Sequence, residues 1–484
     1  MTEKLKEKYN LMPVQVKASF WFLVCSFFQK GISFITTPIF TRILTTGEYG
    51  EYNVFNSWLQ IITPIVSLNL SSGVYAQGIV KFEDERDQFT SSLQGLGLTL
   101  ILAWTIVYLS FHTFFNNIFS LTIVQMICMF MMIWANGSFN FWSMNQRVDF
   151  KYNKLVVMTI AASIAQPLLS IILIKQSIDK VTARILGMTI VQLSMYSWTF
   201  LSQIQKGRRF FYKKFWSYAL KFNIPLLPHY LSLTILSSSD RIMIKKMVGS
   251  SEAGIYSLAY SVAMIMSLFN TALLQTVEPW IYKKLKASKA KDIAKVAYPT
   301  FTFIGAVNIF LIVLALEVIT FFAPKQYYDA IWVIPSVALS VYFTYIYCFF
   351  ATFEFYYEKT KYIASATIGG AVLNILLNYI FIEQYGYLAA GYTTLVSYIM
   401  FAVLHYIFMR KICREFMNNV QPYRLKTVLM ISICTTLLGF GMMLTYPFPA
   451  VRYTIIGITI ILAIIKRETI KEITLNLLNM RKNK

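Results

Sequence analysis

Apolar stretches long enough to cross a bilayer as an α-helix, about 20 residues each, recur along the whole chain. Short polar segments separate them, as neighbouring antiparallel helices require. The pattern predicts an all-α polytopic membrane protein with about 14 transmembrane helices. The predicted spans lie near residues 18–41, 51–79, 90–112, 119–142, 155–175, 181–204, 219–247, 253–281, 296–322, 330–353, 362–382, 387–410, 425–446 and 449–466.

One segment of the chain occurs twice. R-I-L-T-T-G-E-Y-G-E-Y begins at Arg42, and K-M-V-G-S-S-E-A-G-I-Y begins at Lys246. Both copies place Glu-x-Gly-x-Tyr between two apolar stretches, and their glutamates are 252 − 48 = 204 residues apart. Gly187 and Gly391 have the same offset. We interpret each Glu-x-Gly-x-Tyr as a structural cap at the start of a helix, because Glu favours the positive end of the helix dipole.

The offset predicts two pseudo-symmetric six-helix lobes followed by two further helices. With an even number of spans in each half, the repeat is parallel, about an axis along the membrane normal. Halves of this kind are typical of transporters with a site between them. The expected parts are an N-terminal lobe over residues 1–204, a basic cytoplasmic linker over 205–218, a C-terminal lobe over 219–411, and two extra spans with a basic tail over 412–484.

Composition agrees with a membrane protein, because 57% of the residues are hydrophobic, 14% are charged and the mean hydropathy is +0.55. The net charge of +22 invites a nucleic-acid hypothesis. Most of the cations, however, lie on one side of the predicted spans, which is the positive-inside pattern. It predicts a protein of the cytoplasmic membrane with both termini in the cytoplasm. The basic loops Lys206–Lys221 and Lys283–Lys295 should contact anionic lipid headgroups and not nucleic acid.

The sequence contains no motif for an enzyme, a metal site or a bound cofactor. Its five Cys lack metal-ligand or disulfide spacing. The three His, at positions 112, 229 and 405, are scattered and are interpreted as packed or interfacial side chains. No nucleotide-binding or nucleophile motif is present in the sequence. We therefore expect a transporter that uses no cofactor beyond a proton or sodium ion for coupling.

Polar residues form stripes along four predicted spans, at the spacing that brings side chains to one helix face. In the first and seventh spans, the stripes are Ser26, Lys30, Ser33, Thr37 and Thr41, and, 204 residues later, Tyr230, Thr234, Ser237, Arg241 and Lys245. In the second and eighth spans, they are Asn53, Asn56, Gln60, Thr63, Ser67 and Ser71, and Ser257, Tyr260, Ser267, Thr271, Gln275 and Glu278. The stripes predict an aqueous cleft between the lobes, or hydrogen bonds that join helices.

Charged groups within spans carry the functional hypothesis, because intramembrane charges are costly and usually functional. Lys30 is the deepest cation. The predicted substrate-binding residues are Lys30, Arg42, Arg241, Lys245, Gln60 and Asn56. The candidates for binding a coupling proton or sodium ion are Asp240, Glu278 and Glu354. Two structural alternatives remain open: Arg42 snorkels to headgroups, or Asp240 pairs with the adjacent Arg241.

Three segments carry a resemblance to a known family: T-R-I-L-T-T-G-E-Y-G-E-Y, S-S-D-R-I-M-I-K-K-M-V-G-S-S-E-A-G-I-Y-S-L-A-Y and Y-G-Y-L-A-A-G-Y. The chain resembles polysaccharide flippases of the Wzx type, in the multidrug/oligosaccharidyl-lipid/polysaccharide exporter superfamily. The resemblance implies alternating-access transfer of an undecaprenyl-diphosphate-linked oligosaccharide, for O-antigen, capsule or another surface polysaccharide. It also implies a lipid-linked oligosaccharide as substrate and a glycan polymerase and assembly proteins as partners.

Two other classes compete with this hypothesis. An ion-coupled exporter of the multidrug and toxic compound extrusion class shares the six-plus-six plan, but it handles cations and requires an acidic cavity. A membrane enzyme that polymerises or ligates glycans generally requires a large outside loop with catalytic groups, and every predicted outside loop is short.

Overall fold

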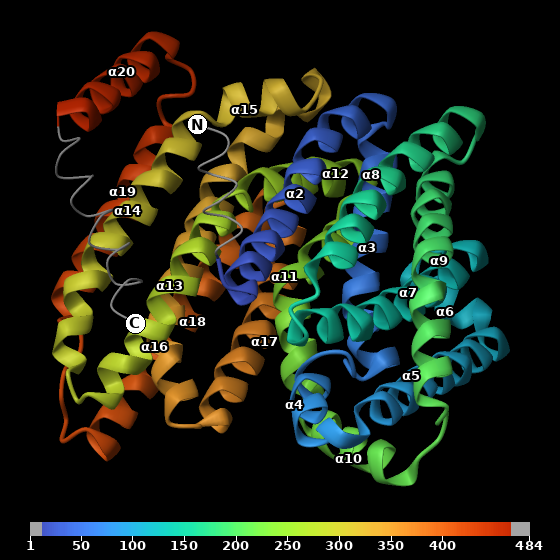
Figure 1. The fold of residues 1–484 in the computed structure, drawn as a ribbon. Helices are drawn as coiled ribbons and strands as arrows, with labels where there is room; N and C mark the ends of the chain where they lie inside the picture. Colours follow the sequence, from blue (N-terminus) through green and yellow to red (C-terminus); the bar gives the residue numbers. More distant parts are fainter. Residues whose placement is uncertain (1–11, 466–484) are drawn as a thin grey trace. The chain divides into compact units, whose positions relative to one another are not determined.

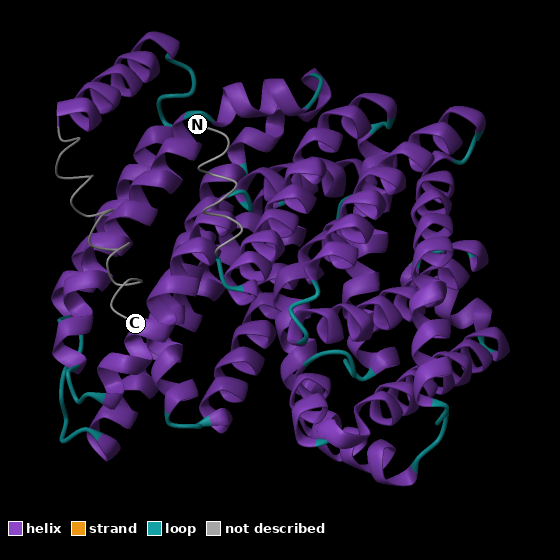
Figure 2. Cartoon of the chain, viewed as in Figure 1, coloured by secondary structure: helices purple, strands orange, loops and turns teal. Residues whose placement is uncertain are grey.

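The chain is helical throughout the part that the structure describes. In this computed structural model, residues 12–465 are described, and helices and loops make up this whole range, without a strand (Figures 1 and 2). The all-α prediction is confirmed. The helices divide into two compact units, unit 1 over residues 1–234 and unit 2 over residues 235–484.

The described part of unit 1, from residue 12 onward, contains nine complete α-helices and the beginning of a tenth. They are α2 (Val14–Ile43), α3 (Thr46–Ser67), α4 (Gly73–Lys81), α5 (Arg86–Ser110), α6 (His112–Phe119), α7 (Ile123–Val148), α8 (Tyr152–Gln176), α9 (Lys180–Gly207), α10 (Lys213–Asn223) and α11 (Leu227–Met247), which continues into unit 2. Two single turns of 3-10 helix, Glu83–Glu85 and Ile224–Leu226, precede α5 and α11.

Unit 2 contains the rest of α11 and the helices that follow it. These are α12 (Ser250–Ala263), α13 (Met266–Lys286), α14 (Ala294–Val313), α15 (Ala315–Phe322), α16 (Ile334–Tyr356), α17 (Thr360–Tyr385), α18 (Leu388–Phe416), α19 (Leu425–Met443) and α20 (Pro449–Ile465). Two 3-10 segments, Ala290–Ile293 and Lys325–Trp332, precede α14 and α16.

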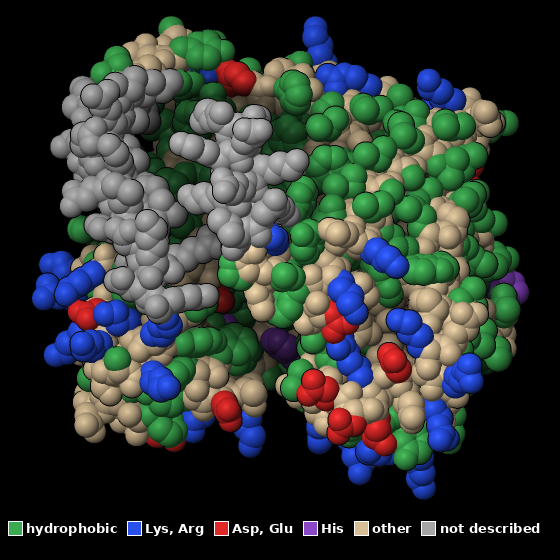
Figure 3. Space-filling model, in the orientation of Figure 1, with side chains coloured by type: hydrophobic (Ala, Val, Ile, Leu, Met, Phe, Trp, Pro, Cys, Tyr) green, Lys and Arg blue, Asp and Glu red, His purple; other side chains and the backbone are tan. Residues whose placement is uncertain are grey.

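Helices lie at the positions of all fourteen predicted spans, and ten of them are long and apolar enough to cross a membrane. The ten do not include α3, α9 and α11, which are long enough but too polar, or α20, which has 17 residues. Polarity along α3 and α11 is what the predicted stripes require. In unit 1, on the right of Figure 3, apolar side chains cover the upper part of the visible face and charged side chains gather toward its lower end.

The second predicted span is interrupted where the sequence pattern suggested one continuous helix. Leu68 and Asn69 adopt left-handed backbone conformations, with φ of 48° and 52°, and α4 begins only at Gly73. Ser71 lies in this turn and is not part of the helical stripe. The Asn223 side-chain amide donates to the Leu68 carbonyl (2.9 Å), so a residue far along the chain holds the turn.

Much of the basic linker is helical. α9 extends to Gly207, and residues 213–223 form the amphipathic helix α10, so the seventh span begins at Leu227 and not at residue 219. Phe215 is fully buried and meets Phe89 of α5 edge-on, with 5.2 Å between ring centroids. Burial of such an aromatic side chain stabilises by roughly 1.5–3 kcal/mol, so packing fixes α10 to unit 1.

The first Glu-x-Gly-x-Tyr copy caps its helix as predicted. The Thr45 hydroxyl accepts from the Glu48 backbone N–H (3.2 Å), and the Glu48 carboxylate accepts from the Thr45 backbone N–H (2.7 Å). This capping box satisfies two backbone donors at the start of α3. In the second copy, Glu252 lies in the first turn of α12, without a side-chain cap at Gly249.

In the part of unit 2 that the structure describes, a buried cation joins α20 to α15. Arg452 is 1% exposed, and its guanidinium donates to the Glu317 carboxylate. The Tyr453 hydroxyl donates to the same carboxylate oxygen (2.8 Å). Glu317 therefore has a structural partner, in agreement with its omission from the predicted site.

Close helix packing explains the two glycines that share the 204-residue offset. A Cβ at Gly187 of α9 would lie 2.6 Å from backbone atoms of Ser170 in α8. A Cβ at Gly391 of α18 would instead meet the Ser336 side chain of α16 at 2.3 Å. The first contact involves backbone and cannot relax by a rotamer change.

We expect Gly187→Ala to destabilise unit 1 by about 1–3 kcal/mol, because it overpacks the contact between α8 and α9. Thermal unfolding of the purified, detergent-solubilised protein measures the effect as a lower Tm. Gly97→Ala in α5 is the matched control, since a Cβ there meets nothing within 4 Å. Equal Tm values for the two variants would contradict the packing argument.

Candidate functional site

A buried carboxylate lies at the centre of a polar cluster in unit 2. Asp240 of α11 is 1% exposed. One of its oxygens accepts from the Tyr256 hydroxyl of α12 (2.6 Å) and the Thr394 hydroxyl of α18 (2.7 Å). The other accepts from the Asn378 side-chain amide of α17 (2.6 Å). Four helices thus contribute to one carboxylate, in a setting where an isolated charge would be costly.

Further amides and hydroxyls extend the Asp240 cluster. The Asn378 amide also donates to the Asn374 side-chain oxygen (3.2 Å), and that oxygen accepts from the Ser239 hydroxyl (3.1 Å). Thr393 donates to the Asn378 side-chain oxygen. Asn374 and Asn378 are one turn apart on α17, and both are fully buried. The cluster therefore combines a carboxylate with amide and hydroxyl oxygens, the donors that hard cations prefer.

The second copy of the repeated motif contributes directly to this cluster. Tyr256 is the Tyr of Glu-x-Gly-x-Tyr, so the interpretation of that copy as a cap without chemistry needs correction. Asp240 also does not form the ion pair with Arg241 that was left open as an alternative. The Arg241 guanidinium lies over the Tyr260 ring, 4.2 Å from its centroid, and donates to the Ser237 carbonyl (3.1 Å). Successive residues of a helix point in different directions, which separates the two charges.

A second buried acid, Glu354 of α16, pairs with a histidine. Its carboxylate lies 2.7 Å from Nδ1 of His405 in α18, and the two side chains are 0% and 1% exposed. The Tyr347 ring stacks on the His405 imidazole, with centroids 5.3 Å apart. Oε2 of Glu354 and Nε2 of His405 have no hydrogen-bond partner among the described residues. The pair therefore joins α16 to α18 through a buried polar contact.

The third acid and the predicted cations lie in other places. Glu278 is half-buried on α13, and Lys245 is half-buried near the end of α11. Lys30 is exposed in the middle of α2. Arg42 is exposed near the end of α2 and donates to the Pro38 carbonyl one turn earlier (2.8 Å). Among the predicted cations, Arg241 is the direct sequence neighbour of Asp240.

The polar stripes on α2 and α3 are present, but much of their hydrogen bonding is local. Ser26, Ser33 and Thr37 each donate to a carbonyl one turn earlier on α2, as hydroxyls within helices often do. On α3, Asn56 is half-buried and Gln60 is exposed. The stripe of α2 therefore offers polar side chains on an exposed helix face.

A cation held between two aromatic rings joins α2 and α3 to α9. The guanidinium of Arg184, 8% exposed, lies between the Phe40 ring (3.7 Å to the centroid) and the Tyr52 ring (3.4 Å). Tyr52 is the Tyr of the first repeated motif. A desolvated cation–π contact contributes about 2 kcal/mol. In each unit, a motif helix thus provides an aromatic face for a buried arginine, Arg184 in unit 1 and Arg241 in unit 2.

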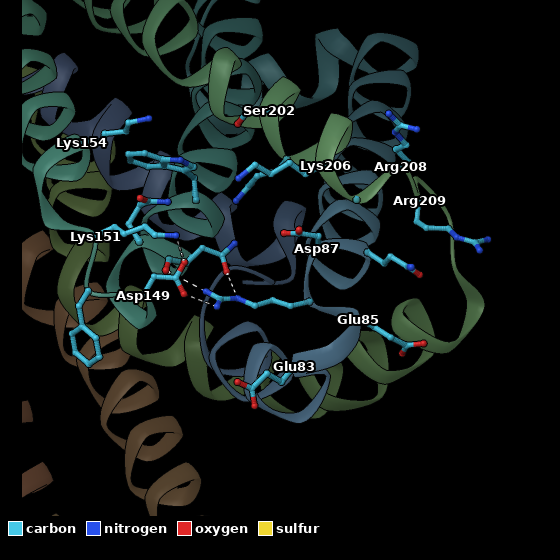
Figure 4. A pocket seen from close by; sticks show the side chains of 18 of the residues that line it. Glu83, Glu85, Asp87, Asp149, Lys151, Lys154, Ser202, Lys206, Arg208 and Arg209 are labelled. Atoms are coloured by element: carbon cyan, nitrogen blue, oxygen red, sulfur yellow. Dashed lines mark hydrogen bonds and ion pairs between the residues drawn. The ribbon is translucent and has the colours of Figure 1, made fainter. Parts of the chain in front are cut away.

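A polar cavity of about 1230 Å³ opens at one end of unit 1, where α7 and α9 end and α5 and α8 begin (Figure 4). The positive-inside pattern predicts that this end is cytoplasmic. Lys206 points into the cavity in Figure 4, whereas the side chain of Arg209 turns away. Its lining combines cations, acids and aromatic rings, which include Lys151, Lys154, Lys206, Arg208, Asp84, Asp87, Asp149, Trp142 and Trp198.

One wall of the cavity is held by an ion-pair network. Arg86 donates to Asp149 (2.7 Å) and to the Asn145 side chain (2.9 Å), and Lys151 donates to the other Asp149 oxygen (3.0 Å). Partial burial raises the pKa of Asp149, but the hydrogen bonds from Arg86 and Lys151 outweigh it and hold the pKa below its usual value. The carboxylate therefore stays charged and its two cations stay engaged.

Sequence reasoning missed several residues that complete these sites. Asn374, Asn378 and Thr394 lie in apolar spans, and their only signal is the one-turn spacing of the two asparagines. His405 was interpreted as a packing side chain, and its pairing with Glu354 joins residues that are 51 positions apart. Of the cavity residues, Lys206, Arg208 and Arg209 belong to a basic loop that the sequence analysis assigns to contact with lipid headgroups.

Comparisons with known proteins identify the class of this chain. Residues 16–285 match the family described as Polysaccharide biosynthesis protein, and the chain belongs to that family. An uncharacterized membrane protein of Haemophilus influenzae is 22% identical over 374 residues, which cover 73% of this chain and 87% of the relative.

Solved structures share the fold. The lipid II flippase MurJ, in an inward closed conformation, matches with a TM-score of 0.68 and 18% identity, over 92% of this chain and 99% of that chain. An inward-facing multidrug resistance transporter of the MATE family, in the MOP superfamily, matches with a TM-score of 0.64 and 16% identity. The match covers 80% of this chain and 95% of that chain. The fold of this multi-pass membrane protein is therefore that of the MOP transporters, and the resemblance to Wzx-type flippases is confirmed at the level of family and fold.

The Asp149 network gives unit 1 a pH-dependent stability. Because the folded pKa lies below the usual 3.8, the contribution is present at neutral pH and is lost as the pH falls through the folded pKa. We expect Asp149→Asn to lower the Tm at pH 7, and the difference from wild type to close below about pH 4. Asp84→Asn, at an exposed acid of the same cavity, controls for the charge change. A Tm difference that persisted undiminished at pH 3 would contradict this account.

Proposed function

We propose that this protein is a flippase that moves an undecaprenyl-diphosphate-linked oligosaccharide across the cytoplasmic membrane by alternating access. The transported glycan serves O-antigen, capsule or another surface polysaccharide. The family supports a role in polysaccharide biosynthesis, and the fold is shared with a lipid II flippase. A polymerase would act on the delivered oligosaccharide, and both termini would lie in the cytoplasm.

The observation that carries the proposal is the buried Asp240 cluster. Alternating access against a gradient requires a group whose charge state or ligation changes between conformations. Asp240 joins α11, α12, α17 and α18 through hydrogen bonds to its own carboxylate. Binding of a proton or a sodium ion would remove or replace those bonds, and would thereby change the packing of four helices. The oxygen donors fit either ion.

The predicted substrate-binding residues fit an anionic headgroup. Lys30, Arg42, Arg241 and Lys245 supply the positive charge that a diphosphate requires, and Asn56 and Gln60 supply polar groups for sugar hydroxyls. We propose that Lys30 binds the diphosphate, because it is exposed in the middle of a long apolar helix. Glu354 and Glu278 stay secondary candidates for ion coupling.

The second candidate function is ion-coupled export of cationic drugs. The shared fold with a MATE transporter favours it. The embedded cations disfavour it, because a cavity for cations requires an excess of acids. Drug susceptibility of host cells that lack their own exporters distinguishes the two functions: protection by this protein would support export.

We expect Asp240→Asn to lower surface glycan below about a tenth of the wild-type level, because the amide cannot release a proton or neutralise a bound cation. The assay is glycan complementation in cells that lack their own flippase, with membrane-inserted protein measured by immunoblot. Glu383→Gln, at an exposed carboxylate of α17, is the matched control. Wild-type glycan in a well-expressed Asp240→Asn strain would remove Asp240 from the coupling mechanism.

We expect Lys30→Ala to leave folded protein in the membrane and to stop surface glycan assembly, whereas Lys30→Arg retains part of the activity. Removal of an exposed lysine costs little packing, so expression should be unchanged. Lys246→Ala, at an exposed lysine of α11, controls for the loss of one cation. If Lys30→Ala cells made normal amounts of surface glycan, Lys30 would have no part in transport.

A further inference from the structure

The cavity of unit 1 has the features of a binding site, and the proposed transport mechanism leaves it unused. At about 1230 Å³, it exceeds the roughly 300–1,000 Å³ typical of small-molecule sites. It lies entirely within one compact unit, at the ends of α7 and α9 and the beginnings of α5 and α8. Residues of unit 1 alone therefore form this surface.

The charges around the cavity divide into engaged and available groups. Arg86 and Lys151 are engaged by Asp149, and Lys214 engages the rim acid Glu85 (2.5 Å). Lys154 and Lys206 are exposed and form no ion pair with a described residue. These two lysines come from the beginning of α8 and the end of α9. Together with the exposed Arg208, they are the cations that an incoming anion would meet.

A buried polar group marks the interior of the cavity as built for a ligand. Gln203 lines it and is 6% exposed. Its side-chain oxygen accepts from Gln94 (2.5 Å), but its Nε2 has no hydrogen-bond partner among the residues that the structure describes. An unsatisfied buried donor costs about 1–3 kcal/mol. The atom is closed off from solvent, so a ligand oxygen in the cavity would recover that cost once the Gln203 side chain rotates toward it.

The mouth of the cavity is shaped by tight backbone packing. A Cβ at Gly207 would lie 2.0 Å from the Asp87 carbonyl, so the end of α9 lies directly against the beginning of α5. Arg208 then takes a left-handed conformation, with φ of 48°, and the chain turns sharply. The Ser91 hydroxyl accepts from the Arg209 N–H (3.2 Å) and fixes the turn. The lysine of α9 is thus held on a rigid rim.

The remaining lining fits a sugar that carries phosphate. Asp84 and Asp87 are exposed acids on the wall formed by the beginning of α5, and they can accept hydrogen bonds from sugar hydroxyls. Trp142 and Trp198 meet edge-on, with centroids 6.3 Å apart, and Trp198 is 52% exposed. An exposed Trp near lysines is typical of the membrane interface. A diacyl phospholipid headgroup has a phosphate, but it does not require an acidic wall.

We infer that this cavity binds the glycosyl-diphosphate headgroup of the lipid-linked substrate in the leaflet where transport begins. Lys154 and Lys206 bind the phosphates, the Gln203 amide donates to a headgroup oxygen, and Asp84 and Asp87 accept from the first sugar. The inference rests on the proposed flippase function. It adds a capture site within unit 1 that is separate from Lys30 and from the Asp240 cluster.

Native mass spectrometry of the purified full-length protein tests the inference with three probes. They are undecaprenyl diphosphate, the same lipid bearing N-acetylglucosamine, and phosphatidylglycerol. We expect Lys154→Ala/Lys206→Ala to weaken binding of both undecaprenyl probes by about tenfold or more. Asp84→Asn/Asp87→Asn should weaken only the sugar-bearing probe. The control Lys286→Ala/Lys289→Ala removes two exposed cations from unit 2 and should leave binding unchanged.

Each other outcome has a defined meaning. Equal binding of the undecaprenyl probes by wild type and the cavity variants would overturn the capture site. Phosphatidylglycerol that binds as tightly as the sugar-bearing probe, and is lost with the same lysines, would also overturn it and would indicate a general anionic-lipid site. Failure of wild type to bind any undecaprenyl probe, together with normal surface glycan in cells that lack this protein, would instead contradict the proposed function. Lys206→Arg, which keeps the charge, should retain binding, and a Tm equal to that of wild type shows that each cavity variant folds.

Discussion

The carboxylate of Asp240 is the constraint on which unit 2 depends. A charged or polar group within a membrane must find its partners in the protein, because lipid offers none. Here the partners come from three other helices, and those helices must keep the register that brings Tyr256, Asn378 and Thr394 to one point. Polar residues that weaken α11 as an apolar span are therefore the same residues that fix its neighbours. In the proposed mechanism, the side chains that hold these helices together also serve ion coupling, which gives a reason for polarity where the bilayer would favour leucine.

Unit 1 meets the same constraint in a different way. Its buried cation, Arg184, is covered by the rings of Phe40 and Tyr52. Its aromatic cluster around Phe89 and Phe215 fixes α10, and its polar groups gather at one end. The two units therefore share the repeated motif and close glycine packing, while their polar chemistry has diverged: a buried carboxylate in one, an open and charged cavity in the other.

The fold was largely predictable from sequence, because the length and apolarity of a spanning helix are local properties. The positions of the predicted spans and the capping by Glu48 follow from such local rules. The break at Leu68 was not predictable, since a contact from Asn223 holds it. The start of α11 at Leu227 has a local signal in Pro225 and Pro228, which the span prediction did not use. The candidate site was predicted only in part. Asp240 and Glu354 stand out as embedded acids, but Asn378, Thr394 and His405 become partners only through packing between distant helices.

The packing of α10 concerns the junction between the two halves of the sequence repeat. In a simple duplication, the junction between copies is a spacer that can be cut, lengthened or replaced. In this chain, the junction has become part of the first copy's core: Phe215 lies among the aromatic rings of α4, α5 and α7. One turn of 3-10 helix later, α11 begins, and it passes from unit 1 into unit 2 as one unbroken helix. The division between the compact units therefore falls inside α11, about 30 residues after the boundary that the sequence repeat suggests.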